Sequence, residues 1–172
     1  MTFSPKPLVM TLVATGVAVL SACIHPAPKL IWNASASVPI GVYRVLPIGA
    51  LALGELVVVQ PTEPLASFLE NGRYLPRGVP LLKQIAAFPG QTVCRESTAV
   101  TIDDVPFGNA LAHDRLGRRL PVWQGCLQLG HEQVFLLNPG RPDSLDGRYF
   151  GPVPATSILG RATPLWTFGE AS

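Results

Sequence analysis

Apolar residues in this chain fall into one long stretch near the N-terminus and a series of short runs after it. The short runs are rich in Val, Ile and Leu and are separated by Pro and Gly, a pattern typical of strands joined by turns. We expect strands at residues 40–45, 55–60, 80–88, 92–95, 99–102 and 133–137. Short strands at regular spacing predict a mostly β domain.

Residues 62–72 have the pattern of a short helix between two of these strands. Thr62 is a candidate N-cap, Pro64 suits the first turn, and Gly72 suits the end of a helix. We therefore expect one short helix inserted among the strands.

The long apolar stretch covers residues 8–24, and residues 7–28 contain no Lys, Arg, Asp or Glu. This length can just span a bilayer, and Lys6 supplies the positive charge that precedes an export signal. We favour a retained membrane anchor. The alternative is a cleaved leader, because residues 20–23 (Leu-Ser-Ala-Cys) resemble the lipidation signal of bacterial lipoproteins. In both interpretations the body lies outside the cytoplasm and against a membrane.

We divide the chain into a signal or anchor segment, residues 1–28, and an extracytoplasmic domain, residues 29–172. The proline-rich residues 25–30 are expected to form a short stiff connector. Cys94 and Cys126 are the only cysteines beyond the first segment, and an even pair in an exported protein predicts a disulfide.

Charge and ligand spacing argue against other classes of function. The net charge of +2 is too small to indicate a nucleic-acid partner, and the densest basic point, Arg118-Arg119, is expected to be a solvated turn. A zinc site made by the two cysteines with His113 and His131 is disfavoured, because no paired ligand spacing is present. We expect neither a metal nor a cofactor.

Lys83 is the only lysine after residue 29, and it lies in the apolar run 81–88. A buried ammonium is costly and is usually relieved by deprotonation. Lowering a lysine pKa from about 10.4 to about 7 represents roughly 4–5 kcal/mol of differential solvation. A neutral lysine can act as a general base for a nucleophile. The alternative is a lysine at a strand edge whose ammonium reaches water.

Ser35 and Ser37 precede Pro39, which disfavours helix in the residue before it and so favours an extended segment. Residues two apart in an extended segment point to the same side, so both hydroxyls could face one reacting atom. One serine would then act as nucleophile and the other as a hydroxyl donor. The alternative is a polar turn that leads into a strand.

Asp146 and Arg148 lie in a third polar cluster, residues 143–153, for which we expect a turn followed by a strand. Their opposite charges could pair. If the pair is exposed and purely structural, it contributes only about 0–1 kcal/mol.

In chain order, these three clusters resemble the sequence boxes of signal peptidase I enzymes. The serine box corresponds to residues 35–39, the lysine box to residues 83–91 and the late acidic box to residues 146–151. Residues 41–43 and 120–126 are most similar to the TraF branch, the conjugative-transfer peptidases that mature pilin subunits. The departures from the family pattern, none of which removes a nucleophile or a base, are Val38, Gln84 and Gly147.

The resemblance implies a signal-peptidase-like antiparallel β-sheet domain with a Ser–Lys dyad. Ser37 would attack the scissile carbonyl, and neutral Lys83 would accept its proton. The backbone N–H of Ser37 and the hydroxyl of Ser35 would hold the oxyanion. Asp146 corresponds to the late acidic residue that TraF-type enzymes need, and Arg148 would support it.

We therefore expect a serine peptidase at the periplasmic face of the bacterial inner membrane, or in the periplasm after leader cleavage. The resemblance implies a conjugative pilin as substrate, processed by hydrolysis or by cyclisation, and other conjugation proteins as further partners. The alternatives are a general signal peptidase and a catalytically silent component of the conjugation apparatus. A Ser-His-Asp triad that uses His113 or His131 is disfavoured, because both histidines lie in expected polar turns.

Overall fold

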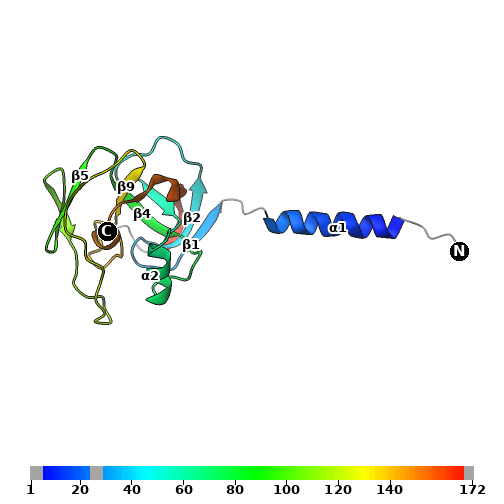
Figure 1. Cartoon of the computed structure of the whole chain (residues 1–172), viewed down its shortest axis with the longest axis horizontal. Coiled ribbons are helices and arrows are strands. Elements are labelled where there is room, and N and C mark those ends of the chain that lie inside the picture. The colour runs from blue at the N-terminus through cyan, green and yellow to red at the C-terminus, as the bar shows by residue number, and fades with distance from the viewer. Residues whose placement is uncertain (1–5, 24–28, 169–172) are drawn as a thin grey trace.

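The structure of the chain is a computed structural model that describes residues 6–23 and 29–168. The first range forms the helix α1 (Lys6–Cys23), drawn in blue in Figure 1, and the second forms a body of strands. Among the described residues, no helix, α1 included, combines the length and the apolar character needed to cross a membrane. The expected membrane anchor therefore stays a prediction, and most of the expected connector lies outside the described residues.

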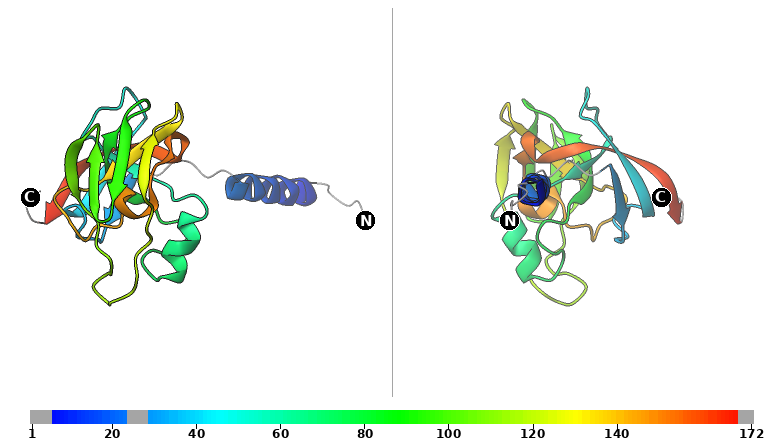
Figure 2. Two further views of the ribbon diagram at one scale, coloured as in Figure 1. Left: turned by 60° about the vertical axis from the view of Figure 1, so that its left-hand side comes forward. Right: turned by 90° about the vertical axis from the view of Figure 1, so that its right-hand side faces the viewer.

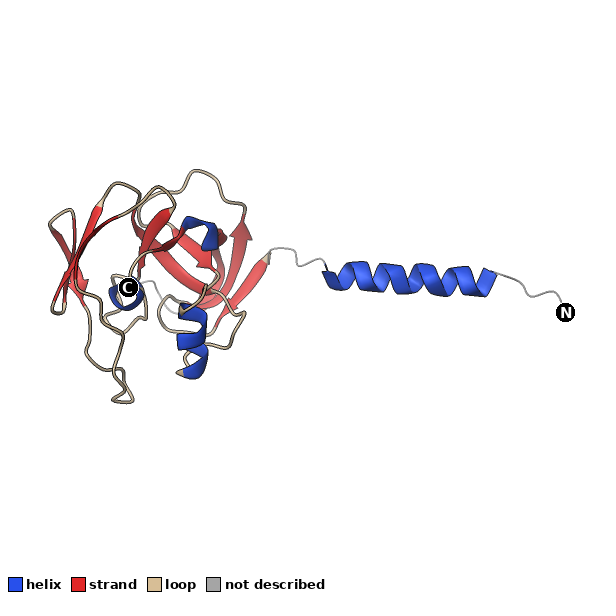
Figure 3. Cartoon of the chain, in the orientation of Figure 1, coloured by secondary structure: helices blue, strands red, loops and turns tan. Residues whose placement is uncertain are grey.

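The described part of the body forms two antiparallel sheets, whose strands are red in Figure 3. The larger sheet contains, in spatial order, β1 (Leu30–Asn33), β2 (Ile40–Leu46), β11 (Ile158–Phe168), β3 (Leu56–Val59), β4 (Leu81–Ala87), β9 (Gln133–Leu137) and β10 (Val153–Pro154). The smaller sheet contains β7 (Val105–Asn109), β6 (Ala99–Ile102), β5 (Thr92–Glu96) and β8 (Gly125–Gln128). The remaining elements are the helices α2 (Leu65–Asn71) and α3 (Gly147–Phe150) and the 3-10 helix η1 (Ala155–Ser157).

The predicted mostly β fold is confirmed, and every apolar run expected to be a strand contains one. The expected short helix is also present as α2, but its N-cap position is occupied by Pro64, without a side-chain cap, rather than by Thr62. The prediction of a turn followed by a strand at residues 143–153 is wrong. Asp146 accepts a hydrogen bond from the backbone N–H of Arg148 and so begins the short helix α3, after which only two residues pair as β10.

The two sheets pack against each other over the C-terminal halves of β4 and β9. Ala87 and Phe135 of the larger sheet share one buried cluster with Val93 and Val100 of the smaller sheet. Leu82 lies in a second cluster, between β4 and the strands β2 and β11. β4 is therefore an inner strand, paired with β3 along its first half and with β9 along its second.

Candidate active site

The end of β1 organises the turn that carries the two serines. Asn33 is buried, and its Nδ2 donates hydrogen bonds to the carbonyls of Ser35 at 2.7 Å, Val38 at 3.1 Å and Pro39 at 3.1 Å. Its Oδ1 accepts from the backbone N–H of Ser35 at 3.1 Å and from the Ser35 hydroxyl at 2.9 Å. One buried amide thus fixes the path of the chain from β1 to β2.

The hydroxyl oxygens of Ser35 and Ser37 lie 3.1 Å apart. The prediction of an extended segment is wrong, because residues 36 and 37 form a turn, yet the turn brings the two hydroxyls together. A hydroxyl has a single proton, and that of Ser35 is donated to Asn33. Ser37 is therefore the donor in the pair, and Ser35 would have to rotate away from Asn33 to donate to an oxyanion.

Lys83 lies on β4 with only 3% of its surface exposed. Its Nζ donates a hydrogen bond to Oγ of Ser144 at 2.7 Å. The pKa of Lys83 is lowered from its ordinary value of 10.5 to about 8, and burial is the main cause. The guanidinium of Arg148 lowers this pKa further, whereas the carboxylate of Asp146 raises it. Roughly a tenth of the molecules therefore hold a neutral lysine at pH 7.

Two buried side chains that the sequence analysis gave no role surround the lysine. Ser144 accepts the hydrogen bond from Lys83 and another from Nδ2 of Asn138 at 3.4 Å. Asn138 also contacts the backbone of β4, where its Nδ2 donates to the carbonyl of Leu82 and its Oδ1 accepts from the N–H of Gln84. The position of Ser144 in the acidic cluster was a signal in the sequence, whereas Asn138 directly follows an apolar strand and gave none.

Asp146 and Arg148 form a fully buried ion pair, 0% and 2% exposed. Arg148 donates from Nε to one carboxylate oxygen at 2.9 Å and from an Nη to the other at 2.8 Å. The carboxylate also accepts from the backbone N–H groups of Arg148 and Asn138. The contribution of about 0–1 kcal/mol expected for an exposed pair does not apply to this one. Removing either partner would leave the other charge buried and alone, which destabilises the fold.

Ser35, Ser37, Lys83 and Ser144 line a single cleft of about 350 Å³. Its apolar lining consists of Leu69, Leu75, Leu81, Leu116, Leu120 and Leu145. Among the described residues, the Nζ of Lys83 has its hydrogen bond with Ser144 and none with Ser37. The cleft thus holds serine hydroxyls, an amine of lowered pKa and an apolar surface.

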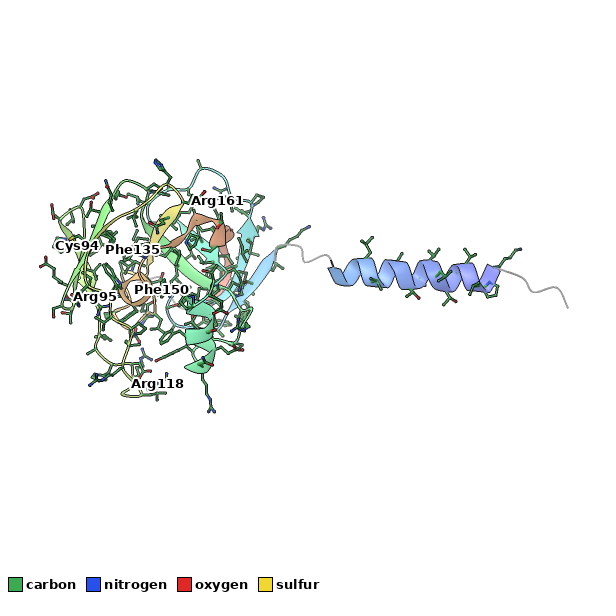
Figure 4. All side chains as sticks on the ribbon, viewed as in Figure 1. Cys94, Arg95, Arg118, Phe135, Phe150 and Arg161 are labelled. Atoms are coloured by element: carbon green, nitrogen blue, oxygen red, sulfur yellow. A yellow bond between two sulfur atoms is a disulfide. The ribbon has the colours of Figure 1, made fainter. Side chains whose placement is uncertain are left out.

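The outer wall of this cleft is built by two segments far apart in the sequence. Both views of Figure 2 show α2 and the loop between β7 and β8 extending from the same end of the body. Tyr74 donates to the carboxylate of Asp114 at 2.7 Å, and Arg118 pairs with the same carboxylate at 2.6 Å. Arg118, labelled in Figure 4, also lies 4.2 Å from the centre of the Tyr74 ring. The prediction that Arg118 and Arg119 form a solvated turn holds for Arg119, which is exposed, but not for Arg118, which donates to the carbonyl of Gly72 at the end of α2 and lines the cleft.

Cys94 and Cys126 lie opposite each other on β5 and β8 and form the expected disulfide. His113 lies in the loop between β7 and β8 and His131 in the turn before β9, and both are exposed. Neither histidine lines the cleft in the described part of the chain. A triad with Ser37 therefore has no support from the geometry.

A second groove, of about 340 Å³, lies on the other side of β4, where Gln84, Ile102 and Phe107 contribute to its lining. Its described lining is mostly apolar and offers an acid, Asp103, but no serine, lysine or histidine. The described serines and the lysine that could act together therefore lie in the cleft of Ser37 and Lys83 and not in this groove.

Comparisons with known proteins identify the family to which this chain belongs. The family model "Signal peptidase, peptidase S26" matches residues 5–166. A probable conjugal transfer protein TraF of Sinorhizobium fredii (strain NBRC 101917 / NGR234) is 33% identical over 178 residues, covering 95% of this chain and 91% of that protein. A conjugal transfer protein TraF of Agrobacterium tumefaciens (strain 15955) is 34% identical over 148 residues, covering 79% of this chain and 81% of that protein.

Among solved structures, the crystal structure of a signal peptidase I from Enterococcus faecalis V583 has a TM-score of 0.41 and 20% identity, covering 67% of this chain and 99% of that chain. A similarity of this size carries no conclusion by itself. The family match and the two relatives are sufficient, and they confirm the resemblance to signal peptidases and to their TraF branch. This chain belongs to the signal peptidase family, peptidase S26.

Proposed function

We propose that this protein is a serine endopeptidase in which Ser37 is the nucleophile and Lys83 the general base. The observation that carries the proposal is the buried amine of Lys83, whose pKa is lowered to about 8, in the same cleft as Ser37. A serine needs such a base to become nucleophilic, and a lysine can serve only when it is neutral.

The reaction would proceed through an acyl-enzyme. Neutral Lys83 accepts the hydroxyl proton as Ser37 attacks the scissile carbonyl, and then passes the proton to the leaving amine. The backbone N–H of Ser37 and the Ser35 hydroxyl, once turned from Asn33, stabilise the oxyanion; removing one such donor costs roughly 10²–10³ in rate. Ser144 holds the Nζ of Lys83 throughout. Water or an amine then attacks the ester, which gives hydrolysis or cyclisation.

We propose a conjugative pilin precursor as the substrate. Two relatives with 33% and 34% identity bear names that refer to conjugal transfer, which supports a role in that process. The leucine-lined cleft supports an apolar peptide segment as the part that binds. The proposal places the enzyme at the periplasmic face of the inner membrane, tethered through its N-terminal segment and next to other conjugation proteins.

Processing of the pilin precursor in cells that carry Ser37→Ala or Lys83→Ala tests this function. Both variants should accumulate unprocessed precursor while the peptidase remains present at its usual level. Normal processing in either variant would instead indicate the catalytically silent component. The mass of the mature pilin separates the two outcomes of the second step, because cyclisation removes one water relative to hydrolysis. A panel of unrelated secreted precursors would distinguish a dedicated enzyme from a general signal peptidase.

A further inference from the structure

The pairing between β4 and β9 stops just before the catalytic lysine. β9 ends at Leu137, opposite Gln84, so that strand does not reach the segment around Lys83. Beyond this point the side chain of Asn138 continues the pairing. Its Oδ1 accepts the N–H of Gln84 at 3.3 Å, and its Nδ2 donates to the carbonyl of Leu82 at 3.2 Å.

A side-chain amide has the same donor and acceptor as a peptide unit and can therefore stand in for a neighbouring strand. Gln84 and Leu82 flank Lys83, and in an antiparallel sheet residues two apart direct their N–H and C=O groups to the same side. On the opposite side of β4, Lys83 pairs with Val57 of β3. The backbone of the lysine is thus held by a strand on one side and by Asn138 on the other.

The same amide reaches the acceptor of the lysine. Nδ2 of Asn138 lies 3.4 Å from Oγ of Ser144, which in turn accepts the hydrogen bond from Lys83. The backbone N–H of Asn138 donates to Asp146 at 3.1 Å, and the residue is only 2% exposed. Asn138 therefore connects the strand that carries the base, the hydroxyl that orients it and the buried ion pair.

We propose that Asn138 is a positioning residue for the peptidase reaction: by replacing a strand partner beside Lys83 and holding Ser144, it sets the geometry of proton transfer from Ser37. Asn138 lines no part of the cleft and acts only through Lys83 and Ser144. The inference rests on the proposed function, since it requires Lys83 to be the base.

Two effects should follow when the amide is removed. In Asn138→Ala, the partly buried N–H of Gln84 and the buried carbonyl of Leu82 lose their partner, and water or backbone movement must replace it. Either change makes the surroundings of Lys83 more polar and raises its pKa from about 8 toward 10.5. The charged groups that act on the amine, Asp146 and Arg148, remain in both states. The second effect is displacement of Nζ, and a misplacement of about 1 Å can cost about 10²-fold in rate.

The first measurement does not depend on any substrate. The chain has three lysines, Lys6, Lys29 and Lys83, so a ¹⁵N NMR titration of the lysine amines resolves the buried one. We expect its titration midpoint to rise by about one pH unit in Asn138→Ala, and to rise also in Asn138→Asp, where the new carboxylate adds its own charge effect. Ser157→Ala is the matched control. Ser157 is 5% exposed and donates to the carbonyl of Pro154 away from β4, so its loss removes a buried hydrogen bond without moving the midpoint.

The second measurement is acylation of Ser37 by p-nitrophenyl acetate at pH 10, where Lys83 is largely neutral in every variant. The Ser37 oxygen forms a bond to the acetyl carbon, nitrophenolate leaves, and Lys83 takes the proton; Ser37→Ala supplies the background rate. We expect acylation to be at least about tenfold slower in both Asn138 variants and unchanged in Ser157→Ala. Asn138→Asp has the size of the native residue, and its acylation rate carries the test if Asn138→Ala does not fold.

Acylation within twofold of the native rate in either folded Asn138 variant, with an unchanged titration midpoint in Asn138→Ala where that variant folds, would overturn the inference. Native-like acylation and precursor processing in Ser37→Ala would overturn the proposed function instead. The two failures are distinguishable, because the lysine titration reports on Asn138 whether or not Ser37 is the nucleophile.

Discussion

Replacing Lys83 by Met should stabilise the folded protein while it abolishes the proposed activity. Lys83 is 3% exposed, and burial lowers its pKa from 10.5 to about 8. This lowering corresponds to about 3 kcal/mol by which the fold disfavours the charged amine. Met is an unbranched apolar side chain that adapts well to core space without a charge, so Lys83→Met should remove that penalty. The lost hydrogen bond to Ser144 offsets about 1 kcal/mol, which leaves a net gain of about 2 kcal/mol.

The gain should depend on pH in a defined direction. Below pH 8 the lysine is charged in both the folded and the unfolded chain, so the full penalty acts on the native protein. Between pH 8 and 10.5 the folded chain has released this proton and the unfolded chain has not, so the free energy of unfolding of the native protein rises with pH. Above 10.5 both states are neutral and the penalty is absent.

Urea and thermal unfolding of Lys83→Met and the native protein at pH 7 and at pH 10.5 measure both parts of this prediction. The variant should be more stable at pH 7, with a melting temperature about 4–8 °C higher, and should lose that advantage at pH 10.5. Lys29→Met is the control, since Lys29 is exposed and its replacement should change stability little at either pH. A variant that is less stable than the native protein at pH 7, or a difference that does not change with pH, would refute the account of a buried, destabilising base.

The remaining predictions concern the rate of peptide cleavage and the buried ion pair. The native rate should rise about tenfold per pH unit and level off near pH 8; a rise that continues to about 10.5 in the pH profile would contradict a lysine base of lowered pKa. Ser144→Ala should lower kcat by about 10–100-fold with little change in KM, because the Nζ of Lys83 loses its acceptor; a change in KM alone would argue for a binding role. Arg148→Met should destabilise the fold by about 3–5 kcal/mol in urea unfolding, because Asp146 stays buried without its partner. Combining it with Asp146→Asn should recover part of the loss, and no recovery would mean that the pair is not coupled.

The strands that the sequence predicts are those whose own residues form an apolar run. β11 does not, since Gly160, Arg161 and Pro164 interrupt its pattern, and it is nevertheless the longest strand. Its pairing with β2 along one edge and β3 along the other supplies what the local sequence lacks. Such pairings join residues about a hundred positions apart and leave no trace in a window of neighbouring residues.

In the candidate site, too, one part could be predicted from the sequence and another could not. The reactive residue types could be chosen from the sequence, because a lone lysine in an apolar run and paired serines before a proline have direct chemical meaning. The geometry between them could not. Ser35 and Ser37 meet through a turn held by Asn33 rather than through an extended strand. The structural role of an asparagine depends on which backbone groups lie beside it in the folded chain. Those neighbours are set by the tertiary structure and cannot be inferred from the local sequence.

The place of Lys83 on an inner strand determines how its pKa is kept low. A lysine on a surface loop can extend its ammonium into water on protonation, so it retains an ordinary pKa. Here the backbone of Lys83 is held by β3 on one side and by Asn138 on the other, and the amine is 3% exposed. With its backbone fixed in this way, the amine stays at a buried position, where protonation costs the fold free energy. The burial that destabilises the charged lysine therefore keeps a fraction of the amine neutral at physiological pH.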